Sequence, residues 1–268
     1  MIKDVKQENQ ISLRKIIILF AAVLFLVMGF SVEASAQKRK VQNLPAYDEA
    51  PYHFGFILGL NQMLFTVKPV EDLPFIKWDP IQSPDIFADS LFVYSVTSSP
   101  TPGFTIGILA NLRLGKYFDF RFVPSLSFGE RILNYDIRAF KDGESQRIET
   151  TKSVTSTFID FPIEFKYKSK RLNNMRAYVL AGASFTLDLA SQKKAAQSSS
   201  DVTVKINKND ILLSAGVGLD FYTGYFKFGM QAKMSYGLNN LIQYEDNIYS
   251  NSIESLRSKV FLLSFTFE

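Results

Sequence analysis

Hydrophobic side chains alternate with small or polar ones in eight separate segments of this chain. A period of two residues predicts a β-strand, because successive side chains of a strand point to opposite faces of its sheet. The apolar members are Tyr52, Phe54, Phe56, Leu58 and Leu60; Phe104, Ile106, Ile108, Ala110, Leu112 and Leu114; Phe118, Phe120, Phe122, Leu126 and Phe128; Ile159, Phe161, Ile163, Phe165 and Tyr167; Val179, Ala181, Ala183, Phe185 and Leu187; Ile211, Leu213, Ala215, Val217, Leu219 and Phe221; Phe226, Phe228, Met230, Ala232 and Met234; and Phe261, Leu263, Phe265 and Phe267. No helical pattern competes after residue 36, and 25 Phe and 12 Tyr favour strands. The chain is predicted to be all-β.

The charges of these segments lie on the face opposite the apolar one. That face mixes Gly, Ser and Thr with Arg113, Arg121, Arg131, Lys166, Lys168, Lys227 and Lys233 and with Asp119, Asp160, Glu164, Asp188, Asp210 and Asp220. A soluble barrel of the lipocalin kind would also alternate, with its apolar face inward. The apolar faces here are nearly free of charge and long enough for the roughly ten-residue strands that cross a bilayer. We therefore predict an eight-stranded antiparallel up-and-down transmembrane β-barrel over residues 52–268.

The connections between the segments alternate in length. Three are short, at Gly115 to Tyr117, Ser169 to Met175 and Thr223-Gly224, whereas long loops are expected near 67–101, 136–152, 190–209 and 240–255. Outer-membrane barrels have short turns in the periplasm and long loops outside the cell. This pattern predicts a multi-pass outer-membrane protein with both termini in the periplasm.

Short turns also predict which inward residues face each other. A two-residue Thr223-Gly224 loop would set Asp220 opposite Lys227, and a three-residue loop at 115–117 would set Arg113 opposite Asp119 and Asn111 opposite Arg121. An eight-stranded barrel is narrow enough to be filled by its own side chains. We expect the inward charges to pair and to leave no open pore; a gated polar path is the alternative.

The first 36 residues resemble a secretory signal. Lys3, Lys6, Arg14 and Lys15 precede the apolar run 16–30, and Ala34-Ser35-Ala36 fits a cleavage site. As a helix, 15 apolar residues reach only about 22 Å, too short for a membrane anchor. Residues 1–36 are therefore predicted to be removed. Residues 37–51 are expected to form an extended periplasmic segment, either a disordered leader or a peptide that docks on another envelope component.

Residue types that carry chemistry are scarce. The absence of cysteine excludes thiolate sites and disulfides, and a net charge of +4 with scattered basic residues leaves no nucleic-acid footprint. The single histidine, His53, is the only candidate general base, and no serine can be placed beside it. We predict no catalytic, cofactor-binding or metal-binding residues, no cofactor and no small-molecule substrate.

Two other patterns favour a structural role over ligand binding. Gly216-Val217-Gly218 lies inside a strand, where glycine more plausibly makes room in the barrel than binds a nucleotide. Asp72, Asp79, Asp85 and Asp89 are interleaved with Pro69, Pro74, Pro80 and Pro84, which favours an irregular surface loop over a calcium site. Its aromatic residues Phe75, Trp78 and Phe87 are candidates to cap the barrel or to meet a partner.

The run from Asn43 to Phe56 (NLPAYDEAPYHFGF), followed by Leu58-Gly59-Leu60-Asn61, resembles the PorT family of Bacteroidetes outer-membrane proteins. The resemblance implies a part in the type IX secretion system, which exports proteins with a C-terminal sorting domain and in some members supports gliding motility. It implies no catalytic residues, and partners among outer-membrane lipid and other secretion components. One departure is Glu268 after Phe267, where many outer-membrane barrels end on the aromatic residue.

Three functions remain open at this point. The first is a non-enzymatic assembly or accessory component of type IX secretion. The second is a generic envelope-stabilising or adhesion barrel that works through its long loops. The third is an outer-membrane lipid-modifying enzyme with His53 as its base.

Overall fold

The computed structural model describes residues 41–79, 81, 83, 86–189 and 204–268. The predicted signal segment 1–36 therefore lies outside the described residues. Within the described part the strands are β1 (Tyr52–Pro69), β2 (Ser90–Ser99), β3 (Thr101–Arg113), β4 (Phe118–Phe122), β5 (Ser125–Lys141), β6 (Glu144–Lys168), β7 (Met175–Asp188), β8 (Asn209–Tyr222), β9 (Lys227–Gly237) and β10 (Ile253–Phe267). Three short helical segments join them: η1 (Tyr47–Glu49), η2 (Leu73–Phe75) and α2 (Ile248–Asn251).

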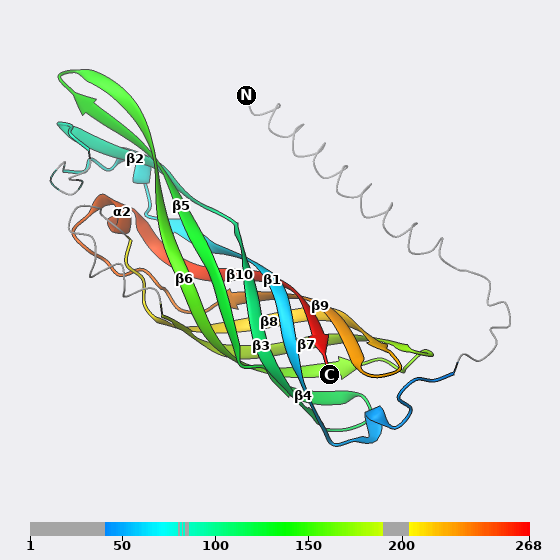
Figure 1. Cartoon of the computed structure of the whole chain (residues 1–268). Coiled ribbons are helices and arrows are strands. Elements are labelled where there is room, and N and C mark those ends of the chain that lie inside the picture. The colour runs from blue at the N-terminus through cyan, green and yellow to red at the C-terminus, as the bar shows by residue number, and fades with distance from the viewer. Residues whose placement is uncertain (1–40, 80, 82, 84–85, 190–203) are drawn as a thin grey trace, which may run out of the picture. The chain divides into compact units, whose positions relative to one another are not determined.

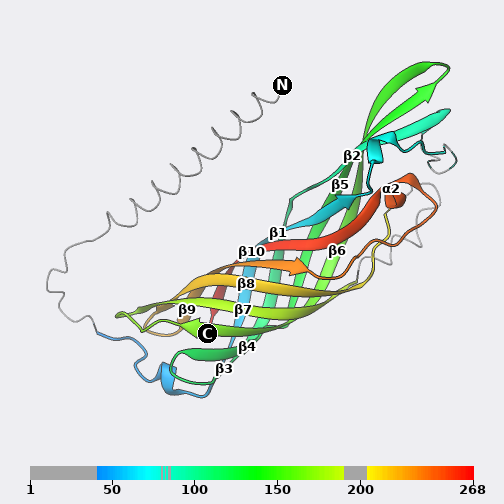
Figure 2. The same cartoon turned by 180° about the vertical axis from the view of Figure 1, so that it is seen from behind.

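The sheet closes on itself. The strand pairs of the described residues are antiparallel, and β1 pairs with β10 on one side and with β3 on the other. Phe56, for example, lies opposite Phe267 on β10 and opposite Ile108 on β3. Figures 1 and 2 show the barrel from opposite sides. The predicted class, an antiparallel up-and-down β-barrel, is confirmed.

The described residues form ten strands rather than the eight predicted, for a local reason. The predicted strand over 118–131 is divided into β4 and β5 at Val123-Pro124, since proline cannot donate to the sheet. The strand β2 lies inside the region expected to be a loop and is separated from β3 by Pro100 alone. Both β3 and β6 pair with β4 and also with β5. The interrupted strands β4 and β5 therefore occupy one position in the barrel wall, which we call a stave.

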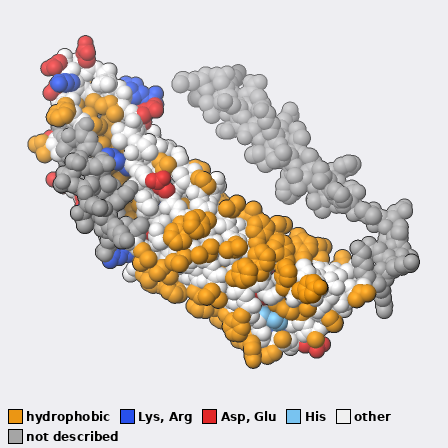
Figure 3. Space-filling view, in the orientation of Figure 1, with side chains coloured by type: hydrophobic (Ala, Val, Ile, Leu, Met, Phe, Trp, Pro, Cys, Tyr) orange, Lys and Arg blue, Asp and Glu red, His pale blue; other side chains and the backbone are white. Residues whose placement is uncertain are grey.

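The apolar faces of the strands point outward, as predicted. Phe54, Ile108, Val217 and Leu263 are between 45% and 68% exposed, whereas Glu164, Lys166 and Asp220 on the opposite faces are at most 1% exposed. Figure 3 shows hydrophobic side chains covering the part of the barrel nearer the short turns and charged ones gathered toward the other end. Large exposed apolar side chains on every stave give the outer wall of a membrane barrel. Among the described residues, no helix is long and apolar enough to cross a bilayer.

We call the two ends of the barrel the turn end, with the turns at 114–117, 169–174 and 223–226, and the loop end, with the longer connections. At the loop end, the loop predicted over 136–152 is wrong: β5 and β6 stay paired up to Lys141 opposite Glu144. The hairpin turns on Asp142 and Gly143, both with positive φ (50° and 81°), the conformation that two-residue hairpin loops require. This hairpin and β2 project beyond the other strands (Figure 2).

A hydrophobic core lies inside the loop end. Its buried members include Phe65, Leu133, Tyr135, Tyr249 and Leu256, contributed by β1, β5, α2 and β10. The regions expected to be long loops near 67–101 and 240–255 thus contain β2, α2 and the start of β10, and they pack as a small apolar cap. Trp78 packs against this core, while Phe75 and Phe87 are 82% and 86% exposed.

At the turn end, one of the two predicted registers is confirmed and the other is wrong. Arg113 lies opposite Asp119 and Asn111 opposite Arg121, as predicted. The β8–β9 turn has four residues, not two, so that Tyr222 pairs with Lys227, and Asp220 with Gly229. The reason is Thr223, whose hydroxyl accepts hydrogen bonds from the backbone N–H groups of Tyr225 and Phe226 and holds the wider turn. Because side chains alternate with a period of two, a register shift of two residues leaves the same side chains facing the lumen.

Candidate functional site

Ion pairs fill the part of the lumen nearer the turn end. The N–O distances are 2.7 Å for Lys166 and Asp220, 2.6 Å for Lys168 and Asp119, 2.8 Å for Lys227 and Glu268, and 2.7 Å for Lys233 and Glu164. All eight side chains are at most 11% exposed. A buried charge is tolerated only when it is paired and hydrogen-bonded, and these groups neutralise one another across the barrel.

The wider β8–β9 turn decides which lysine pairs with which acid. Both carboxylate oxygens of Asp220 accept hydrogen bonds from Lys166 on β6, and the predicted partner Lys227 binds Glu268 instead. Glu268 follows the outward Phe267, so the strand alternation turns its carboxylate into the lumen, where it is fully buried. The signal in the sequence is the alternation itself, which places residue 268 on the inward face after the outward Phe265 and Phe267.

Arg121 is buried among these pairs. Its Nη1 donates to Gln231 Oε1 at 3.1 Å, and the Tyr178 hydroxyl donates to the same oxygen at 3.2 Å. Lys166 Nζ lies 3.7 Å from the centroid of the Tyr178 ring. Gly218 makes room for that ring, because a Cβ there would lie 2.3 Å from Tyr178 Cζ. This agrees with the expectation that glycine in this strand creates space inside the barrel.

A small polar cavity of about 40 Å³ lies farther from the turn end. Asp160 lines it and accepts hydrogen bonds from Thr186 Oγ1 at 2.6 Å and from Ser127 Oγ at 3.1 Å. The cavity is large enough for about one to three waters. It is a gap in a filled lumen and not a channel.

Arg131 separates this cavity from the apolar cap at the loop end. Its guanidinium pairs with Asp188 at 2.8 Å and donates to Ser156 and Ser258. The rings of Phe65 and Phe158 lie 4.3 and 4.8 Å from its central carbon. Polar groups and aromatic faces together satisfy a fully buried cation here.

Residues 42–51, which we call the mouth segment, fold against the turn end of the barrel. Asn43 Nδ2 donates to the Tyr222 carbonyl at 3.0 Å, Arg113 Nη1 donates to the Glu49 carbonyl at 3.0 Å, and Arg171 donates to the Asn43 and Leu44 carbonyls. These partners belong to different staves and turns of the ring. The mouth segment also belongs to the same compact unit as the barrel. The expectation of an extended or disordered segment is therefore wrong for residues 42–51.

One carboxylate anchors the mouth segment. Asp48 Oδ1 accepts hydrogen bonds from Arg176 Nη1 at 3.0 Å and from the Tyr222 hydroxyl at 2.9 Å, and Arg171 lies 3.9 Å from its other oxygen. Sequence reasoning missed this contact because Asp48 precedes the first strand and its partners are more than 120 residues away.

Tyr47, beside this anchor, turns inward and meets His53. Their rings stack with centroids 3.9 Å apart, and His53 Nε2 lies 2.8 Å from the Tyr47 carbonyl oxygen. Burial, with the nearby Glu268 carboxylate adding to it, raises the pKa of the Tyr47 hydroxyl well above its usual range, so the phenol stays neutral. Within the described residues, the side chain of His53 bonds to a backbone carbonyl and not to a serine hydroxyl. This geometry does not make His53 a base beside a nucleophile.

Where the acidic loop after β1 is described, two of its carboxylates accept hydrogen bonds from backbone N–H groups, one within the loop and one from the β5–β6 hairpin. Asp79 Oδ1 accepts from Ile81 N, and Asp89 Oδ2 accepts from Asp142 N. Asp85 lies outside the described residues, as do Pro80 and Pro84. In the described part of the chain, no three His, Cys, Asp or Glu side chains are grouped as a metal site would require.

An outward apolar wall on a closed antiparallel barrel with an ion-paired interior defines a β-barrel protein of the membrane type. The model of the outer membrane protein β-barrel domain family matches residues 35–243, and the chain belongs to this family. The protein is therefore an outer-membrane β-barrel. A search of curated proteins found no match. Among solved structures, the outer membrane protein OprG from Pseudomonas aeruginosa is similar over 81% of this chain and 95% of that chain, with 13% identity and a TM-score of 0.36.

Proposed function

We propose that this barrel is a non-enzymatic component of the type IX secretion system, with an assembly or accessory role. In this proposal the turn end and both chain ends face the periplasm, residues 1–36 are removed as a signal, and the partners are other secretion components. The support for the pathway is the resemblance of residues 43–61 to the PorT family.

The observation that carries the proposal is that this run forms one structural unit. The mouth segment and the first half of β1 together close the turn end, with Asp48 as the anchor. The outer side of the mouth segment remains accessible, since Pro45, Ala46 and Glu49 are exposed. A partner at this end of the barrel would therefore meet residues 45–49.

The filled lumen favours an accessory role over a conduit. A translocated protein would have to displace the buried ion pairs, the Arg131 layer and the apolar cap in turn. Breaking a single buried pair costs about 3–5 kcal/mol. We infer that cargo does not pass through this barrel.

The test is deletion of the gene, followed by comparison of the secreted proteins. If the proposal holds, proteins with a C-terminal sorting domain stay behind as precursors, and the wild-type gene restores their export. Complementation with Glu49→Lys, which reverses a charge on the exposed side of the mouth segment, should restore export poorly. Lys141→Glu at the far hairpin is the matched control and should restore it fully.

Normal export in the deletion strain would contradict the proposal and favour the second function, an envelope-stabilising or adhesion barrel. The observation that favours this alternative is the exposure of Phe75 and Phe87 at the loop end, 82% and 86%. Loss of surface attachment in a Phe75→Ser, Phe87→Ser variant with intact secretion would support it.

A further inference from the structure

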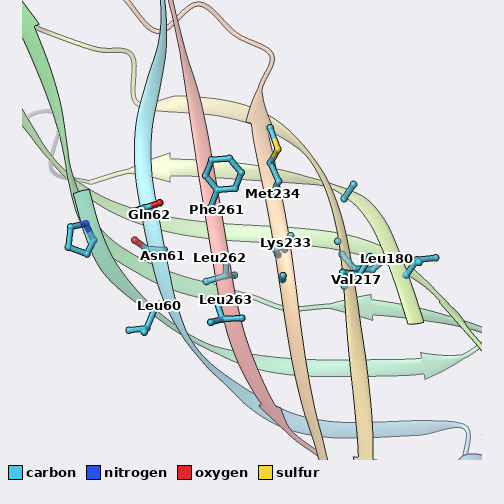
Figure 4. A pocket seen from close by; sticks show the side chains of 15 residues that line it. Leu60, Asn61, Gln62, Leu180, Val217, Lys233, Met234, Phe261, Leu262 and Leu263 are labelled. Atoms are coloured by element: carbon cyan, nitrogen blue, oxygen red, sulfur yellow. The ribbon is translucent and has the colours of Figure 1, made fainter. Parts of the chain in front are cut away.

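The outer wall of the barrel carries a groove that the ion-paired lumen does not explain. Its volume is about 780 Å³, within the range of small-molecule sites. Residues of six strands line it, and its outward side chains include Leu60, Val217, Ala232, Met234, Phe261 and Leu263. Figure 4 shows Leu60, Leu263, Phe261 and Met234 side by side on β1, β10 and β9.

The groove lies in the part of the wall that faces hydrocarbon. Its outward lining residues on β1 and β10 lie opposite each other, Leu60 paired with Leu263 and Gln62 with Phe261, and the buried Asn61 and Leu262 between them also line it. Ala215 and Ala232, which also line the groove, have small side chains. The outer surface is therefore recessed there relative to the larger side chains around it. An apolar recess at this position is shaped for a hydrocarbon chain.

Two cations stand directly on the loop-end side of the groove. Ser258 binds Arg131 inside the lumen, so its neighbours Arg257 and Lys259 face outward. Lys259 Nζ lies 5.3 Å from the centroid of the Phe261 ring, which lines the groove. Among the described residues, no carboxylate forms an ion pair with either cation, whereas Lys68 on the next strand is paired with Glu254 at 2.5 Å.

Three other staves carry no cation at this position. At the matching level on other staves, the outward residue after the last apolar one is Glu130 on β5, Thr157 on β6 and Asn209 on β8. Uncompensated positive charge thus occurs where the apolar groove reaches the membrane surface. A cation near that surface attracts an anionic headgroup by about 1 kcal/mol, or roughly fivefold.

We propose that the groove and its two cations form a binding site for a phosphate-bearing membrane lipid. One acyl chain lies in the groove along Leu60, Leu263 and Val217. The lipid phosphate is held by Arg257 and Lys259, with Tyr236, which pairs with Lys259, beside it. The proposal does not depend on a role in secretion.

The experiment uses the purified barrel in mixed micelles that contain phosphatidylglycerol and phosphatidylcholine in equal amounts and with the same chains. Native mass spectrometry counts the lipids that remain bound. The wild-type protein should retain phosphatidylglycerol preferentially, and Arg257→Gln with Lys259→Gln should lower this preference by roughly 25-fold. Arg138→Gln with Lys141→Gln removes the same charge from the projecting hairpin and should leave the preference unchanged.

Two further measurements separate the parts of the site. Ala232→Trp fills the groove and should reduce retention of both lipids, while the variant still migrates as a folded barrel on an unheated gel. Inorganic phosphate should displace no more lipid than chloride at equal ionic strength. Equal retention of the two lipids by wild type, an unchanged preference in the Arg257→Gln, Lys259→Gln variant, or specific displacement by phosphate would each overturn the proposal.

Discussion

Asp220 shows how one residue in a turn can decide the pairing of a buried charge. A two-residue turn would have placed it opposite Lys227, but Thr223 widens the turn and Asp220 binds Lys166 instead. Lys227 then pairs with Glu268, the last residue of the chain. The alternation correctly predicted which side chains point inward, because that depends only on the parity of the strand. It could not predict partners that depend on turn length.

The Lys166–Asp220 pair leads to a prediction on stability. Asp220→Asn leaves a fully buried ammonium without its carboxylate and should lower the free energy of unfolding by about 3–5 kcal/mol. Urea titration of the folded barrel in detergent micelles measures the loss. Asp72→Asn, the same change at an exposed position, should have no effect.

A second substitution tests the cause. Adding Lys166→Met to Asp220→Asn removes the stranded charge and should recover part of the lost stability. If Asp220→Asn unfolds at the same urea concentration as wild type, the pair is not an important contact.

At the scale of elements, the mouth segment is the part that the sequence described least well. Its polar composition and its prolines indicated an extended leader, whereas η1 and the Asp48 contacts make it part of the barrel. The reason is that its partners, Arg171, Arg176 and Tyr222, come together only when the barrel has closed. No local pattern in residues 37–51 records them.

Asp48→Asn should loosen the mouth segment. The neutral amide loses the charge-assisted hydrogen bond to Arg176, worth about 1.5 kcal/mol at a partly exposed site, so the segment should open roughly tenfold more often. Hydrogen exchange at the Tyr47 and Glu49 amides, which bond to the Leu44 and Ala46 carbonyls, reports this opening. Glu49→Gln neutralises the adjacent exposed carboxylate and should not change it. Equal exchange in both variants would show that Asp48 is not the anchor.

Two turn glycines form a matched pair, Gly143 in the β5–β6 hairpin and Gly115 in the turn between β3 and β4. Gly143 has φ +81° and open space around it, whereas Gly115 has equally open space and no positive φ. Gly143→Ala should therefore destabilise its turn by about 1 kcal/mol through backbone strain alone, while Gly115→Ala should be nearly neutral. Hydrogen exchange of the two turns measures both effects. Similar losses at the two positions would contradict the assignment of the turn.

For the whole molecule, the distribution of charge leads to a prediction on transport. The mouth segment, the ion pairs, the Arg131 layer and the apolar cap follow one another along the axis, and the cavity among them is only about 40 Å³. We expect planar-bilayer recordings of the purified barrel to show no stable large conductance. A steady large current would instead support the gated polar path, with the inward charges as its lining.

The sequence by itself determined the barrel, the outward apolar wall and the inward charges, because each follows from a period of two residues that any strand obeys. It also determined the Arg113–Asp119 register, where the strands adopt the short turn that the spacing predicts. Tertiary structure decided the rest. The partners of Asp48 and Asp220 and the cap around Tyr249 join residues distant in the chain. Such contacts arise only when closure of the sheet brings the strands and their ends together.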